Sequence, residues 1–219
     1  MAMIRESDVK YLMDEFNKHL KNDVDLVIFS SNSPECKYCK ETVDLAKEVS
    51  AINGKIKLKV YDFDKDKDLA EEYGVTKFPA TIVAKANEKD GRIKYYGIPS
   101  GYEFGSLIED LKTVSSGEAD ISSKAMELIS KVDKPLKIRV YVTPTCPYCP
   151  KAVGTAHKFA LVNKNISGEM IESGEFYSEA EEVGVSAVPH IVINDSVQFQ
   201  GARSDEDFAE YVMEAFKHA

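Results

Sequence analysis

The sequence predicts an α/β fold made of two related units, each a mixed sheet with helices on both faces. Three observations lead to this prediction. Strand-like apolar alternation and helical amphipathic spacing follow one another along the chain. Special positions recur at a separation of 110 residues, from Cys36 to Cys146 and from Pro79 to Pro189. A chain of 219 residues also suits two domains of about 100 residues each.

The first half begins with an amphipathic helix, for which Ser7 is a plausible N-cap. Gly74 ends a short helix, and a turn through residues 87–91 separates the last two strands. The expected helices cover residues 7–21, 36–51, 66–73 and 103–115, and the expected strands cover residues 24–30, 56–62, 80–86 and 93–97.

The second half repeats this order. A short turn joins antiparallel neighbours and a helical crossover joins parallel strands, so each unit should contain a mixed sheet. We expect the boundary near Gly117, in a small polar stretch, which gives units of residues 1–117 and 118–219. The expected helices cover residues 121–132, 147–163, 177–183 and 205–217, and the expected strands cover 136–142, 166–172, 190–194 and 197–200.

All four cysteines occur in two CxxC pairs, Cys36 with Cys39 and Cys146 with Cys149. A disulfide that closes so small a loop constrains the unfolded chain little, so redox chemistry or metal binding explains the pairs better than stability. A helix N-terminus stabilises a thiolate. We therefore expect Cys36 and Cys146 to be the attacking thiolates and Cys39 and Cys149 the resolving thiols of thiol–disulfide exchange.

Two prolines, Pro79 and Pro189, each begin a strand after a loop. If their preceding peptide bonds are cis, the backbone of Phe78 and Val188 is exposed for pairing with an extended peptide. A trans proline that merely starts an edge strand is the alternative. The matched placement in both repeats favours the cis form, and we expect these four residues to bind substrate.

Charge and hydropathy limit the partners. A net charge of −9 argues against nucleic acid, which needs a basic surface. The chain has no apolar run long enough to predict a membrane span, and its first residues lack the apolar core of a signal peptide. We therefore expect a cytoplasmic protein with no metal, and with no cofactor beyond its redox-active disulfides.

Each half resembles a thioredoxin-fold unit, and the Cys-Pro-Tyr-Cys sequence that ends at Cys149 resembles a glutaredoxin active site. Together the halves resemble the two-unit, glutaredoxin-like protein disulfide oxidoreductases of thermophilic archaea and bacteria, over nearly the whole chain. The resemblance implies a cis-proline facing each CxxC pair. It also implies reduction, oxidation and isomerisation of disulfides in protein substrates, with electrons supplied by a thioredoxin-reductase-like flavoprotein.

The sequence departs from thioredoxins in two places. Many thioredoxins have a tryptophan before the first cysteine, where this chain has Glu35 and Thr145. Thioredoxins also carry a buried acid six residues before that cysteine, where this chain has Ser30 and Val140. The proton acceptor for the resolving thiol is therefore open. Two acids that end the second strand of each unit are candidates, or else simply solvated strand ends: Asp62 and Glu172.

Three other functions fit parts of the sequence. The two CxxC pairs could together form a four-thiolate zinc site, although their spacing is far longer than usual. A glutathione-dependent glutaredoxin would use the Val188-Pro189 step with Gly201 and Ser204, which otherwise indicate a strand end and a helix N-cap. A binding module without catalysis would use the fold alone.

Overall fold

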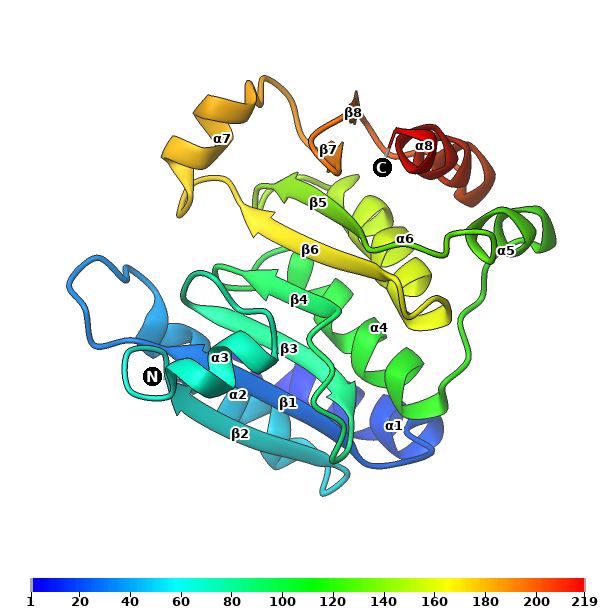
Figure 1. The fold of residues 1–219 in the computed structure, drawn as a ribbon. Coiled ribbons are helices and arrows are strands. Elements are labelled where there is room, and N and C mark those ends of the chain that lie inside the picture. The colour runs from blue at the N-terminus through cyan, green and yellow to red at the C-terminus, as the bar shows by residue number, and fades with distance from the viewer. Residues whose placement is uncertain (1, 219) are drawn as a thin grey trace. The chain divides into compact units, whose positions relative to one another are not determined.

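A computed structural model describes residues 2–218, which contacts divide into two compact units (Figure 1). Both are α/β structures with a mixed sheet, as predicted. The first unit contains residues up to Gly91 with Tyr96–Ile98 and Ile108–Glu118, and the second contains Arg92–Tyr95, Pro99–Leu107 and the residues from Ala119 onward. The division of the sequence at residue 117 stays a prediction.

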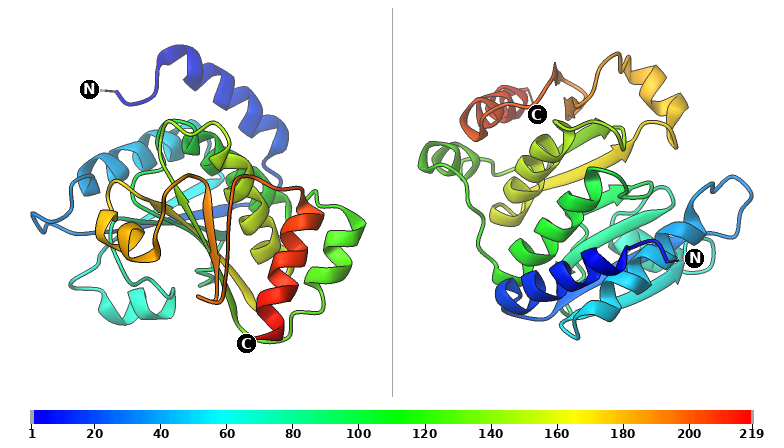
Figure 2. Two further views of the ribbon diagram at one scale, coloured as in Figure 1. Left: turned by 90° about the horizontal axis from the view of Figure 1, so that it is seen from above. Right: turned by 180° about the vertical axis from the view of Figure 1, so that it is seen from behind.

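In the first unit, β1 lies between a parallel and an antiparallel neighbour, in the strand order β2-β1-β3. Helices α1 and α2 cover one face of these strands and α3 covers the other (Figures 1 and 2). The strands are β1 (Val24–Ser30), β2 (Ile56–Asp62) and β3 (Ala80–Lys85), and the helices are α1 (Glu6–His19), α2 (Cys39–Ile52) and α3 (Lys67–Glu72).

The second unit repeats this arrangement and adds an antiparallel edge strand, in the order β6-β5-β7-β8. Helix α6 packs beneath β5 and β6, and α8 packs on α5 and β8. The strands are β5 (Leu136–Val142), β6 (Ile166–Glu172), β7 (His190–Ile193) and β8 (Val197–Gln200), and the helices are α5 (Ser123–Ile129), α6 (Cys149–Val162), α7 (Tyr177–Val183) and α8 (Asp205–Lys217). None of the helices within residues 2–218 has the length and apolar character needed to cross a membrane.

Strand β4 (Ile93–Tyr96) and helix α4 (Glu103–Ser116) contribute residues to both units. In the second unit, the carbonyl oxygen of Arg92 accepts a hydrogen bond of 2.8 Å from the backbone N–H of Gly168 in β6. An ideal Cβ on Gly168 would lie 2.7 Å from the His157 ring of α6, so glycine permits this close packing of helix on strand. β6 is therefore continuous through a glycine that normally weakens a strand.

Two predicted helices begin later than expected. α2 was expected from Cys36 but begins at Cys39, because Tyr38 has a non-helical backbone (φ −128°) and Cys36 N–H instead closes a turn onto Ser33. α5 is shorter than the predicted 121–132, since the Ser122 side chain caps it by accepting a hydrogen bond from the Ala125 N–H.

The repeat is not uniform. In the strand pairing, Ser30 lies beside Asp62 and Val142 lies beside Glu172. The second-strand partners are therefore 110 residues apart, whereas the first-strand partners are 112 apart. The loop that leads from β1 to the first cysteine is consequently two residues longer than its counterpart after β5.

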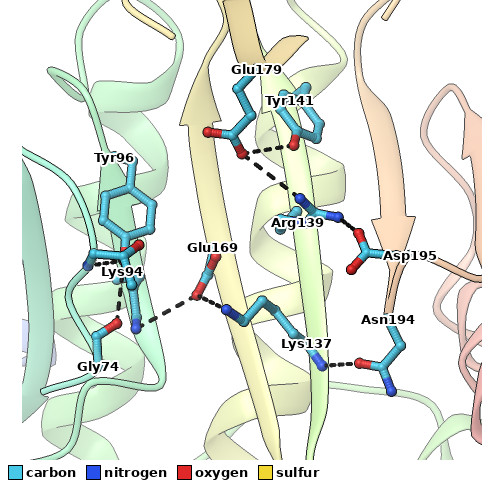
Figure 3. A network of polar contacts seen from close by, with 11 residues as sticks. Gly74, Lys94, Tyr96, Lys137, Arg139, Tyr141, Glu169, Glu179, Asn194 and Asp195 are labelled. Carbon is cyan, nitrogen blue, oxygen red and sulfur yellow. Dashed lines mark hydrogen bonds and ion pairs between the residues drawn. The ribbon is translucent and has the colours of Figure 1, made fainter. Parts of the chain in front are cut away.

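A polar network covers the face of the second unit that α6 does not contact (Figure 3). At its centre, Glu169 Oε1 lies 3.6 Å from Lys94 Nζ and 3.6 Å from Lys137 Nζ. Lys94 and Glu169 are only 4% and 3% exposed. A buried charge needs a partner, so this pair matters more to stability than a surface ion pair of the same geometry.

The same network fixes α7 to the sheet. Arg139 of β5 pairs with Glu179 of α7 and with Asp195 in the turn between β7 and β8. The Tyr141 hydroxyl donates a hydrogen bond of 2.9 Å to Glu179. Burial raises the pKa of Tyr141, which keeps this phenol protonated as a donor.

The segment before α4 packs on the loop that precedes α6. Tyr102 N–H donates a hydrogen bond of 3.0 Å to the carbonyl oxygen of Pro144, two residues before Cys146. Gly101 has φ +61°, and an ideal Cβ there would lie 2.2 Å from the same oxygen. This position therefore requires glycine, both for its left-handed backbone and for the close approach.

We expect Glu169→Ala to destabilise the protein by about 3 kcal/mol, because it removes an ion-pair partner of the buried Lys94. Urea unfolding measures the change. The control is Glu127→Ala, which removes an exposed pair with Lys131 on α5 and should change stability little. Equal losses in the two variants would contradict the importance assigned to the buried pair.

We expect Gly101→Ala to cost about 1–2 kcal/mol for its left-handed backbone alone, and more because the Pro144 loop must move. Thermal unfolding measures this loss. Gly105 in α4 has open space around its Cβ position, so the control Gly105→Ala should leave stability unchanged or raise it by about 0.5–1 kcal/mol. A Gly101→Ala protein as stable as the wild type would refute the close-approach argument.

Candidate functional site

The first candidate site lies where the loop after β1 meets α2. Cys36 is in the turn that precedes the helix, and Cys39 is its first residue. A disulfide joins them, with Cα atoms 5.6 Å apart. Cys36 is partly exposed, whereas Cys39 is buried. The first cysteine is therefore the more accessible one, as an attacking thiol must be.

The second candidate site has the same construction. Cys146 precedes α6 and Cys149 begins it, joined by a disulfide with Cα atoms 5.5 Å apart. Cys146 is 7% exposed and Cys149 is fully buried. Pro150 occupies the first turn of the helix, where its missing N–H leaves no intrahelical bond unmade.

Backbone N–H groups donate to sulfur in both sites, but to different cysteines. In the second site, Cys149 N–H donates to Cys146 Sγ at 3.2 Å. In the first site, Ser31 N–H donates to Cys39 Sγ, also at 3.2 Å. Such donors stabilise a thiolate, as does the helix N-terminus itself. The two dithiols are therefore electrostatically different, and the sequence pattern gives no sign of the Ser31 contact.

The two prolines predicted from the repeat both follow cis peptide bonds, Phe78-Pro79 and Val188-Pro189. In the second unit, the carbonyl oxygen of Val188 lies 3.7 Å from Cys146 Sγ. The carbonyl oxygen of each proline accepts a hydrogen bond from a glycine N–H on the following strand, Gly97 at 2.9 Å and Gly201 at 2.8 Å. The structure thus brings Val188 to its dithiol.

The two acids considered as proton acceptors hold the turns that follow β2 and β6. Asp62 accepts hydrogen bonds from Asp64 N–H and Lys65 N–H, and its hydrogen bond with the Lys65 side chain lowers its pKa. Glu172 accepts hydrogen bonds from Gly174 N–H at 3.1 Å and Glu175 N–H at 2.7 Å. Both carboxylates therefore have structural partners, and a carboxylate with a lowered pKa is a weaker proton acceptor.

The residues that suggested a glutathione site also have structural partners. The Ser204 side chain caps α8 by accepting from Asp207 N–H, and Asp205 accepts a hydrogen bond of 2.9 Å from the Thr155 hydroxyl. His190, next to Pro189, is buried with its ring nitrogens facing two glutamine side chains of β8. Within residues 2–218, no group of three or more potential ligands is arranged to hold a metal ion.

The model of the thioredoxin domain family matches residues 25–109 and 136–214. Among solved structures, a protein disulfide oxidoreductase from Aeropyrum pernix has 31% sequence identity and a TM-score of 0.88, over 98% of this chain and 94% of its own. A domain of the alkylhydroperoxide reductase AhpF from Enterococcus faecalis has 25% identity and a TM-score of 0.87, over 95% of this chain and 99% of its own.

Among curated proteins, an NADH dehydrogenase of Bacillus subtilis is 24% identical over 192 residues, which are 88% of this chain and 35% of that protein. The chain thus spans about a third of the length of the curated relatives that it matches most fully. The family match covers both halves of the chain and includes both cysteine pairs. This chain therefore belongs to the thioredoxin domain family, as a tandem repeat with a CxxC disulfide in each half.

Proposed function

We propose that this chain is a protein dithiol–disulfide oxidoreductase that reduces, forms or isomerises disulfides in protein substrates. One observation carries the proposal: each cysteine pair closes its own disulfide at the start of a helix, with the first cysteine more accessible than the second. An exchange reaction needs this order, because the first thiol must meet the substrate and the second must wait within reach.

In the reducing direction, the thiolate of Cys36 or Cys146 attacks one sulfur of a substrate disulfide. A mixed disulfide forms and the other substrate sulfur leaves as a thiolate. The thiolate of Cys39 or Cys149 then attacks its neighbour, and the second substrate sulfur leaves. Two electrons pass to the substrate, its sulfurs take protons from solvent, and the CxxC pair ends as a disulfide. Oxidation of a substrate is the same sequence in reverse.

The backbone beside each proline would hold the substrate, through Phe78 and Pro79 in the first site and Val188 and Pro189 in the second. The short distance from the Val188 carbonyl oxygen to Cys146 Sγ supports this role. A peptide whose sulfur bonds to Cys146 has its own backbone N–H groups nearby, and one of them can donate to this oxygen. Extended peptides are commonly held by such main-chain pairing.

The cysteine pairs themselves would carry the electrons, so the proposal needs no further cofactor or metal. A thioredoxin-reductase-like flavoprotein would supply electrons for reduction. A region similar to this chain occupies about a third of an alkyl hydroperoxide reductase protein of Staphylococcus aureus, which supports a link to a reductase. We also propose a cytoplasmic location, no membrane or nucleic-acid partner, and a boundary between the repeats at residue 117.

Insulin reduction by dithiothreitol tests the proposal, because the reduced B chain precipitates and scatters light. The wild type should accelerate precipitation, and the double variant Cys36→Ser/Cys146→Ser should fall to the dithiothreitol background, since neither site then has its attacking thiolate. Equal rates for the wild type and the double variant would refute the proposal. Glutathione in place of dithiothreitol tests the glutaredoxin alternative, which requires faster turnover with glutathione.

Variants that lack a resolving thiol should accumulate the mixed disulfide. We expect Cys39→Ser and Cys149→Ser to form covalent adducts with a disulfide-bonded protein, visible on non-reducing gels and released by dithiothreitol. Cys36→Ser and Cys146→Ser, each combined with loss of the other site, are the matched controls and should form fewer adducts. Adducts formed equally well through the second cysteines would reverse the assigned roles.

A further inference from the structure

One contact at the first site has no role in the exchange chemistry described above. Ser31 directly follows β1, and its N–H donates to Cys39 Sγ at 3.2 Å. Both residues are buried, with exposed fractions of 7% and 4%. A backbone amide in such a place acts on the sulfur only if its position is fixed, because donation weakens steeply with misalignment.

The Ser31 side chain provides that fixation. Its hydroxyl donates a hydrogen bond of 2.7 Å to Asp64 Oδ2 and accepts one of 3.0 Å from Ser33 N–H. Asp64 is itself held in the turn after β2, where its N–H donates to Asp62 Oδ1 at 3.1 Å. The link therefore joins the loops that follow two adjacent parallel strands, and it holds Ser31 through its side chain while its amide faces the sulfur.

We propose that Asp64 is a positioning residue for the first dithiol: through the Ser31 hydroxyl it keeps the Ser31 amide aimed at Cys39 Sγ. This inference rests on the proposed function, because a resolving thiol must react as a thiolate. When Cys39 attacks the mixed disulfide, a Cys36–Cys39 bond forms and the bond from Cys36 to the substrate sulfur breaks. A fixed N–H favours the thiolate that performs this step.

The second site offers a built-in comparison. Gly174 stands 110 residues after Asp64, and Thr143 follows β5 as Ser31 follows β1. The amide that reaches sulfur there is that of Cys149, on the helix itself. The Asp64 link is therefore a property of the first site, and its loss should leave the second dithiol unchanged.

The charge of Asp64 and its hydrogen bond act in opposite directions. A nearby carboxylate disfavours a thiolate, so removing its charge alone would make thiolate formation easier. Losing the anchor for the Ser31 amide would make thiolate formation harder. Asp64→Asn keeps an oxygen that can accept the Ser31 hydroxyl, whereas Asp64→Ala does not. The two variants therefore separate the anchoring effect from the effect of charge.

The test uses the full chain with Cys146→Ser/Cys149→Ser, which leaves only the first dithiol. Ultraviolet thiolate absorbance follows its titration, and equilibration with glutathione gives its reduction potential. Asp64→Ala should move the Cys39 titration to higher pH. It should also favour the disulfide by about tenfold, which lowers the reduction potential by about 30 mV for this two-electron couple. Ser31→Ala should act in the same direction.

Asp64→Asn should stay near the parent protein, and Asp68→Ala, which removes an exposed carboxylate from α3, should change neither measurement. The proposal is overturned if Asp64→Ala matches the parent, if Asp64→Asn and Asp64→Ala shift alike, or if Asp64→Ala also shifts the second dithiol in a Cys36→Ser/Cys39→Ser background. These measurements need no protein substrate, so a failed insulin assay would leave their outcome readable.

Discussion

Hydrogen bonds from backbone amides to cysteine sulfur are the interaction on which this molecule's chemistry depends. A thiolate within a folded protein needs donors, and the start of a helix supplies them without a charged side chain. In both repeats a strand, a loop and a helix together bring such an amide to within 3.2 Å of sulfur. The mixed sheet, its helices and the polar network of the second unit hold these three parts in place.

Much of this arrangement could be predicted from the sequence. The recurrence of cysteine, glycine and proline at one spacing identified two similar units, and the apolar alternation of β1 and β5 located the strands that precede the sites. The cis-prolines were also predictable, because their matched placement outweighed the low frequency of cis bonds. These features depend on residue type and local spacing, which a sequence states directly.

Other features depend on where backbone atoms meet, and no residue pattern reports that. The turn through Cys36 delays α2 until Cys39, and the longer loop after β1 shifts the register by two residues. The bond between Ser31 and Asp64 joins residues 33 positions apart that have no distinctive motif. Serine and aspartate are ordinary loop residues, so only the folded structure reveals that one of them aims an amide at sulfur.

The contact of Gly101 and Tyr102 with the Pro144 loop concerns how the two repeats can be separated. These residues precede α4 in the first half of the sequence, yet they support the backbone just before the second cysteine pair. A gene fragment that encodes the second repeat alone would therefore lack part of its own scaffold. Recombination that exchanges halves at residue 117 would join a foreign support to this loop, so a working chimera would have to carry the stretch from Arg92 to Leu107 with the second half.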